Sequence, residues 1–222
     1  MPKVKFVFDK EKDLFNIWET CNKSSSWYDH KKNISSTFLE ICEGKEFDKC
    51  KKELEDYRTK MYNSRLIELF VDSIQKAWNK INDEFFKRLE KITKRKFKFE
   101  KINAYITTVM RCPYNYQEPS FMVSFFRDLT GALSTCGHEL IHIQFHNTYW
   151  NDIERQTGKE KTADLKEALT VLLNLEFKDL WFVEDKGYEP HKELREFIEK
   201  EWQKKKDFDV LMKKCVTYLK KN

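Results

Sequence analysis

The sequence predicts an α+β fold that is mainly helical and contains a small mixed or antiparallel sheet near its centre. Two patterns support this prediction: apolar residues recur at helical spacing along most of the chain, and short β-branched and aromatic runs interrupt them. Only 5 Gly and 4 Pro occur among 222 residues, too few for a turn-rich all-β fold. Aromatic residues make up 15% of the chain, which excludes disorder for most of it.

The first half of the chain predicts several helices after one short strand. Apolar and polar residues alternate from Val4 to Phe8, which is a strand pattern. A helix is expected over Asp13–Cys21, followed by a Ser-rich loop at Ser24–Ser26. From Phe38 to about Ile92 the apolar residues keep helical spacing, and Asn63-Ser64 is expected to begin the second helix there.

The period of the pattern changes in the middle of the chain. Phe97–Phe99, Ala104–Met110 and Phe121–Phe126 are rich in β-branched and aromatic residues, so we expect strands there. Pro113 and Pro119 bracket the loop between the last two runs. This arrangement suggests an antiparallel pair or a meander.

Helical periodicity returns after these strands. It predicts helices at Thr130–His146 and at about Lys161–Phe177, and two more after Pro190, a residue suited to a first helical turn. The chain is long enough for one to two units, and no repeat or linker divides it. We expect a single unit over residues 1–222, with subdomains at residues 1–147 and residues 148–222.

The charge composition gives little support for a nucleic-acid or membrane partner. The 42 Lys and Arg residues nearly balance 37 Asp and Glu residues, and such mixed charge indicates a solvated surface. The densest basic run, Lys91–Lys101, interleaves Lys with Phe97 and Phe99, a pattern that suits a nucleic-acid groove. A helix end followed by an amphipathic strand is the expected structure, and nucleic acid is not an expected partner.

The cysteine pattern indicates free thiols. Six cysteines, at positions 21, 42, 50, 112, 136 and 215, include no CxxC pair that would suggest a zinc ribbon. The chain opens on charged sequence rather than the apolar stretch of a signal peptide, and no run is long enough to cross a bilayer. We therefore expect a reduced cytoplasmic protein with mostly buried thiols and no membrane partner.

The residues that carry chemistry lie in the helix expected at Thr130–His146. Residues 137–142 are GHELIH, so His138 and His142 stand four apart, one above the other on a helical face. Two imidazoles at that spacing suit one tetrahedral zinc ion. Glu139 projects about 100° round the helix, where it can accept a proton from a metal-bound water without being a ligand.

The opposite face of this helix is apolar, with Leu133, Cys136, Leu140 and Ile143. A helix that is buried on its back and polar on its front suits the wall of an active-site cleft. The alternative is a histidine pair on an ordinary amphipathic helix. His146 lies near the metal-facing side but roughly two turns beyond His138, so it cannot bind the same ion. It is expected either to support the site from behind or to line the cleft.

Zinc needs a third protein ligand if water is to keep the fourth position. Glu167 is the preferred candidate, because its helix is expected to bear an apolar core stripe and, opposite, a stripe of small and polar residues. This second stripe comprises Ala163, Glu167, Thr170 and Asn174. Thr170 and Asn174 are expected to form hydrogen bonds around the ligand. Asp164 is the rival ligand, and a solvent-exposed Glu167 is the alternative.

These residues resemble a known family. HELIH followed by a helix that carries Glu167 resembles the zincin metallopeptidases, and specifically the gluzincins with a thermolysin-type zinc site, over roughly residues 102–177. The metzincin pattern HExxHxxGxxH is excluded, because its Gly and third His are missing. The gluzincin pattern Asn-Glu-x-x-x-Asp is not kept, since Lys166 precedes Glu167 and Val171 replaces the Asp.

The resemblance implies a zincin-like fold and a zinc-dependent peptidase. It implies a Zn²⁺ cofactor held by His138, His142 and Glu167, with Glu139 as general base and acid and a peptide or protein as substrate. It also implies that an edge strand binds the substrate backbone, and Phe121–Phe126 is the expected strand. An accessory donor is expected to stabilise the oxyanion, and the candidates, which also suit structural roles, are Tyr149, Tyr188 and His191.

Three alternatives stay open. A peptide-deformylase-like hydrolase would use Cys112 or Cys136 as a ligand, but that family's glycine-rich segments are absent. A zincin that acts on a single partner, such as a repressor or a DNA-crosslinked protein, would keep the same site. A non-catalytic binding module would use the helical residues 1–95 as its surface but would not need Glu139. For residues 1–95 we expect a scaffold rather than a lid.

Overall fold

A computed structural model describes residues 1–23 and 29–221 of the protein. The loop expected at Ser24–Ser26 lies outside the described residues. The chain is mainly helical and contains a small mixed sheet, so the predicted α+β class is confirmed. The first half contains β1 (Lys3–Phe8), α1 (Lys10–Asn22), the 3₁₀ turn η1 (His30–Asn33), α2 (Ser36–Cys42), α3 (Phe47–Tyr62) and α4 (Arg65–Thr93).

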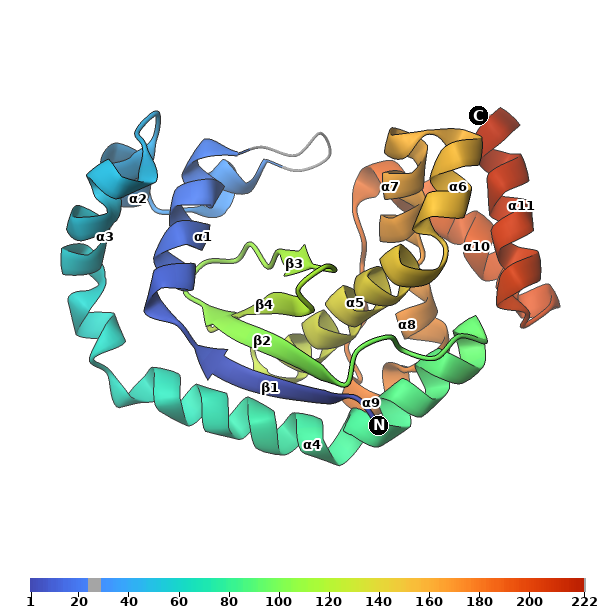
Figure 1. Cartoon of the computed structure of the whole chain (residues 1–222), viewed down its shortest axis with the longest axis horizontal. Coiled ribbons are helices and arrows are strands. Elements are labelled where there is room, and N and C mark those ends of the chain that lie inside the picture. The colour runs from blue at the N-terminus through green and yellow to red at the C-terminus, as the bar shows by residue number, and fades with distance from the viewer. Residues whose placement is uncertain (24–28, 222) are drawn as a thin grey trace.

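The sheet is completed in the middle of the chain by β2 (Lys101–Thr107), β3 (Tyr114–Asn115) and β4 (Ser120–Ser124). The helices that follow are α5 (Leu129–Thr148), α6 (Trp150–Thr157), α7 (Lys159–Ala168), α8 (Val171–Glu176) and α9 (Lys178–Trp181). The chain then forms the 3₁₀ turn η2 (Glu189–His191), α10 (Lys192–Lys204) and α11 (Phe208–Lys221). Figure 1 shows the sheet in the middle of the molecule, with α1–α3 on one side and α6, α7, α10 and α11 on the other.

The helices α1, α2 and α4 begin at side-chain N-caps. The Asp9 carboxylate accepts a hydrogen bond from the Lys12 amide at the start of α1. The Ser64 hydroxyl accepts one from the Leu66 amide at the start of α4, which confirms the predicted cap. The long helical pattern from Phe38 to Ile92 therefore divides among α2, α3 and α4.

The described strands form one sheet in the order β1-β2-β4-β3. The pairs β1–β2 and β2–β4 are parallel, and only β3 runs antiparallel to its neighbour β4. The predicted antiparallel pairing of the Ala104–Met110 and Phe121–Phe126 runs is therefore wrong. The segment between the two runs contains β3, which pairs antiparallel with β4. Since β3 runs opposite to β2, β4 then runs parallel to β2.

The strand expected at Phe97–Phe99 is also absent from the described residues. The α4 helix ends at Lys94 in the left-handed region, with φ 53°. The Phe97 amide donates to the Glu90 carboxylate, and the Phe97 ring packs on Phe86 with centroids 5.0 Å apart. The aromatic side chains thus belong to an irregular segment that packs against α4.

The largest group of buried apolar side chains lies between the sheet, α4 and α5. Leu133, Cys136, Leu140 and Ile143 all belong to it, so the apolar back of α5 is confirmed. The α4 helix packs along β1 in this core, as a scaffold requires (Figure 1). Gly137 allows α5 to approach α9 closely, because a Cβ there would lie 2.6 Å from the Trp181 ring.

The helix expected at Lys161–Phe177 is interrupted between α7 and α8. Its predicted core stripe is nevertheless buried, and comprises Leu165, Ala168, Leu169, Leu172 and Leu173. Leu173 belongs to the expected second subdomain, residues 148–222, but packs in the core beside the sheet. The division into two subdomains stays a prediction. The six cysteines are free, and all but Cys112 are buried. No helix among the described residues has the length and apolarity to cross a membrane.

Candidate metal centre

The α5 helix presents two histidines side by side. The rings of His138 and His142 lie one turn apart, with centroids separated by 4.4 Å. His142 is 2% exposed, and neither of its ring nitrogens has a hydrogen-bond partner in the part of the chain that the structure describes. Burial lowers the pKa of His142 to about 3, so the imidazole is neutral and keeps a free lone pair. A buried, neutral imidazole suits a metal ligand.

Glu167, in the last turn of α7, completes a three-residue group. Its Oε2 lies 3.3 Å from His142 Nε2 and 3.6 Å from His138 Nε2. One ligand atom from each of the three residues lies within 4.8 Å of the others, and no other described residues form such a group. The expected third ligand is therefore brought to the histidines. Asp164 is not, because it is half exposed and its carboxylate contacts His191 at 3.2 Å.

Sequence reasoning missed Asp185. Its Oδ2 lies 2.6 Å from His138 Nδ1, so the ring donates there and directs its Nε2 toward Glu167. Asp185 is itself held by Arg195, with Nη1 3.1 Å from Oδ1. No spacing rule predicts this partner, because it stands in an irregular segment far from His138 in the sequence.

Thr170 and Asn174 form hydrogen bonds around the site as expected, but they do so through Asp185. The Thr170 hydroxyl lies 2.9 Å from Asp185 Oδ1, and its contact with Glu167 involves only the backbone carbonyl oxygen. The Asn174 side chain bonds both backbone groups of Asp185, at 2.8 and 2.9 Å. The helix breaks between α7 and α8, and these side chains therefore face the Asp185 segment rather than the Glu167 carboxylate.

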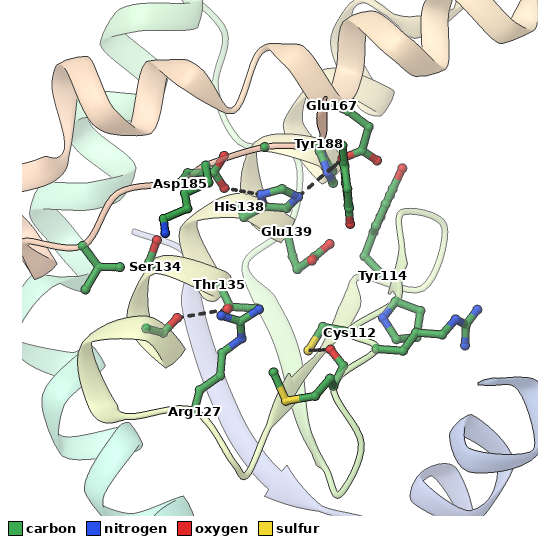
Figure 2. A pocket seen from close by; sticks show the side chains of 18 of the residues that line it. Cys112, Tyr114, Arg127, Ser134, Thr135, His138, Glu139, Glu167, Asp185 and Tyr188 are labelled. Carbon is green, nitrogen blue, oxygen red and sulfur yellow. Dashed lines mark hydrogen bonds and ion pairs between the residues drawn. The ribbon is translucent and has the colours of Figure 1, made fainter. Parts of the chain in front are cut away.

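Glu139 has the environment of a general base. It is 6% exposed, and burial raises its pKa to about 7. A carboxyl group with this pKa exchanges protons readily near neutral pH. Figure 2 shows its carboxylate directed into the cavity beside His138. Glu139 and the three-residue group share this cavity, which has a volume of about 530 Å³.

Of the accessory candidates, only Tyr188 lines this cavity. Figure 2 shows its ring beside Glu167. Tyr149 lies elsewhere, and its hydroxyl is 2.9 Å from both Asp209 Oδ1 and the carbonyl oxygen of Thr93. His191 is buried against Asp164 and does not line the cavity. Tyr188 is therefore the accessory candidate that the geometry retains.

His146 does not line the cavity, so of its two expected places the structure leaves the one behind the site. Its ring is stacked between Tyr116 and Trp150, at centroid distances of 4.2 and 4.1 Å. Its Nε2 lies 2.7 Å from the hydroxyl of Tyr114, a cavity residue from β3 that sequence reasoning also missed. His146 therefore acts on the cavity only through Tyr114.

The cysteines and the expected substrate strand take other places. Cys136 is fully buried on the back of α5, and Cys112 lines the cavity without joining the three-residue group. Among the described residues β3 pairs with β4 at Ser120 and Phe121, so only the start of the run Phe121–Phe126 is covered at the edge of the sheet. The edge strand beside the cavity is β3, whose Tyr114 ring lies 5.2 Å from the ring of His142.

The residues fit a zinc ion. Two imidazole nitrogens and one carboxylate oxygen form a donor set of catalytic zinc sites, in which the fourth position is open to water. The carboxylate–histidine contact of Asp185 is the usual support for such a ligand. Burial alone would raise the pKa of Glu167, but the two histidines and Lys166 lower it. The carboxylate is therefore ionised, as binding of a metal requires.

We expect Asp185→Asn to weaken zinc binding by about 10–100-fold, because the amide neither carries the charge nor orients His138 as strongly. The affinity is measured by competition with a chromophoric chelator. Asp179→Asn is the control, since Asp179 pairs with Arg88 at the surface and does not line the cavity. Equal zinc affinity in Asp185→Asn and wild type would show that Asp185 does not support the ligand.

The chain was compared with known proteins. It matches no protein-family model, no curated protein and no solved structure. The assignment of a function therefore depends on the geometry of this site and on the residues that build it.

Proposed function

We propose that this protein is a zinc-dependent peptidase of the gluzincin type. The observation that carries the proposal is the meeting of His138, His142 and Glu167 with a buried Glu139 in one cavity. The three ligands alone would also suit a structural ion. A buried carboxylate that faces the cavity beside them serves hydrolysis, because a general base is needed there.

The bound zinc would lower the pKa of a coordinated water and polarise the scissile carbonyl group. Glu139 takes the proton of that water and passes it to the leaving amine, a transfer that suits a carboxyl with a pKa of about 7. Asp185 keeps the His138 ring in the orientation that directs Nε2 toward the ligand group. Tyr188 donates its hydroxyl hydrogen to the oxyanion that develops on the carbonyl oxygen.

The substrate is a peptide in extended conformation. An edge strand offers unpaired backbone groups to an added strand, and β3 occupies the edge beside the cavity. We therefore expect the substrate backbone to pair with β3 rather than with β4. Tyr114 places this strand directly beside the histidines, so a bound peptide backbone would pass the site.

The test is hydrolysis of a peptide library and of an unfolded protein by the zinc-loaded chain. We expect cleavage that stops when a strong chelator removes the metal and returns when zinc is restored. Products are identified by mass spectrometry, which also separates endopeptidase from exopeptidase action. Zinc binding without cleavage of either substrate would reject a general peptidase and favour a binding module or a partner-specific protease.

A further inference from the structure

Lys166 is buried directly beside the candidate metal centre. It is 8% exposed, and lysine is seldom buried without a partner. Its Nζ lies 2.6 Å from Glu167 Oε1 and 4.9 Å from the centre of the Tyr114 ring. The Tyr114 hydroxyl is in turn fixed by His146 at 2.7 Å. Two segments that are distant in sequence, α7 and β3, therefore enclose this ammonium group.

The two carboxylate oxygens of Glu167 have different partners. Oε1 contacts the Lys166 ammonium, whereas Oε2 lies 3.3 Å from His142 Nε2 and 3.6 Å from His138 Nε2. A free carboxylate can bind a metal through one oxygen or through both. A charge-assisted hydrogen bond to one oxygen favours binding through the other.

We propose that Lys166 is a positioning residue that restricts Glu167 to a single metal-binding oxygen, Oε2. This inference rests on the proposed function, because it concerns the ligand of the same zinc site. With Oε1 held by Lys166, Glu167 occupies one coordination position, and a position stays open for water. The ammonium also withdraws charge from the carboxylate, so the ligand donates less to the ion and leaves it a stronger Lewis acid.

A purely structural Lys166 would do less. It would only balance the charge of a buried glutamate, and its loss would lower stability and loosen the ligand. If Lys166 instead positions Glu167, its loss should not weaken metal binding. Without the ammonium, Glu167 can offer both oxygens, so the ion is held at least as tightly. Together with the water it becomes five-coordinate and a weaker Lewis acid.

The experiment compares Lys166→Met with wild type after loading with cobalt(II), whose visible absorption distinguishes four-coordinate from five-coordinate ions. We expect a strong four-coordinate spectrum in wild type and a weaker five-coordinate spectrum in Lys166→Met. Zinc affinity should be equal or tighter in the variant, and kcat should fall by about 10-fold or more with KM little changed. Lys166→Arg, which keeps a cationic donor, should restore the wild-type spectrum.

The matched control is Lys161→Met, on the same helix, since the Lys161 ammonium donates to the Leu219 carbonyl oxygen away from the cavity. If Lys166→Met does not fold, Lys166→Gln is measured in its place, because it is neutral, shorter and less apolar. Identical spectra and kcat in wild type and the neutral variant would overturn the inference but leave the zinc site intact. A wild-type chain that binds neither cobalt nor zinc would instead refute the proposed function itself.

Discussion

We expect Glu139→Gln to lower the rate of the proposed peptide hydrolysis by about 10²–10⁴-fold while the protein keeps its zinc, and we expect the same of Glu139→Ala. Glutamine has nearly the shape of glutamate but accepts no proton, so the variant loses only the acid–base step. Metal binding survives because Glu139 is not a member of the ligand group. The effect is large because, among the described residues, each of the other carboxylates that line the cavity is held by a partner. Glu167 contacts His142, Asp185 contacts His138, and Glu184 pairs with Lys178.

Two measurements check this prediction. Elemental analysis reports the zinc content, and mass spectrometry of a cleaved peptide library reports the rate. The control is Glu184→Gln, because Glu184 lines the same cavity but pairs with Lys178 at 2.6 Å. We expect this control to cleave at close to the wild-type rate. A Glu139 variant that cleaves as fast as wild type would mean that the proposed mechanism is wrong.

We expect His142→Ala to abolish zinc binding and all metal-dependent activity. His142 belongs to the group of three candidate ligands and is only 2% exposed, so its loss would leave two ligands. Metal-site affinity depends steeply on the number of ligands, since each is placed by the folded chain before the ion arrives. We expect about one zinc per chain in wild type and almost none in the variant.

The measurement is elemental analysis of protein prepared without a histidine tag. His191→Asn is the control, since His191 is also buried but contacts Asp164 outside the ligand group. It should retain zinc as wild type does. Zinc that persists in His142→Ala would remove this residue from the site. A wild-type chain without zinc, even after zinc is added, would reduce the histidine pair to a coincidence of helix spacing.

Local periodicity in the sequence was enough to predict much of this site. His138, Glu139 and His142 take their relative positions from the turn of one helix, which the apolar residues on its back predict. Glu167 could be proposed because small and polar residues share its helical face. Both inferences concern residues a few positions apart on a regular element, where spacing alone decides direction.

The sheet shows where such reasoning fails. Each strand of the sheet was visible in its composition except the two-residue β3, yet pairing and direction were not. β3 stands between β2 and β4 in the sequence, and a strand of two residues leaves almost no periodic signal. The interruption between α7 and α8 was equally hidden, because the core stripe continues across it while the polar side chains change direction.

By itself, the sequence determined the α+β class, the helix with two histidines and a glutamate, and the preferred third ligand. Only the tertiary structure brought Asp185 to His138 and buried Lys166 between Glu167 and Tyr114. In the sequence Lys166 is one more lysine on a Lys- and Glu-rich helix. Its environment comes from a strand that stands far away along the chain, and such contacts depend on how elements pack rather than on the spacing within any one of them.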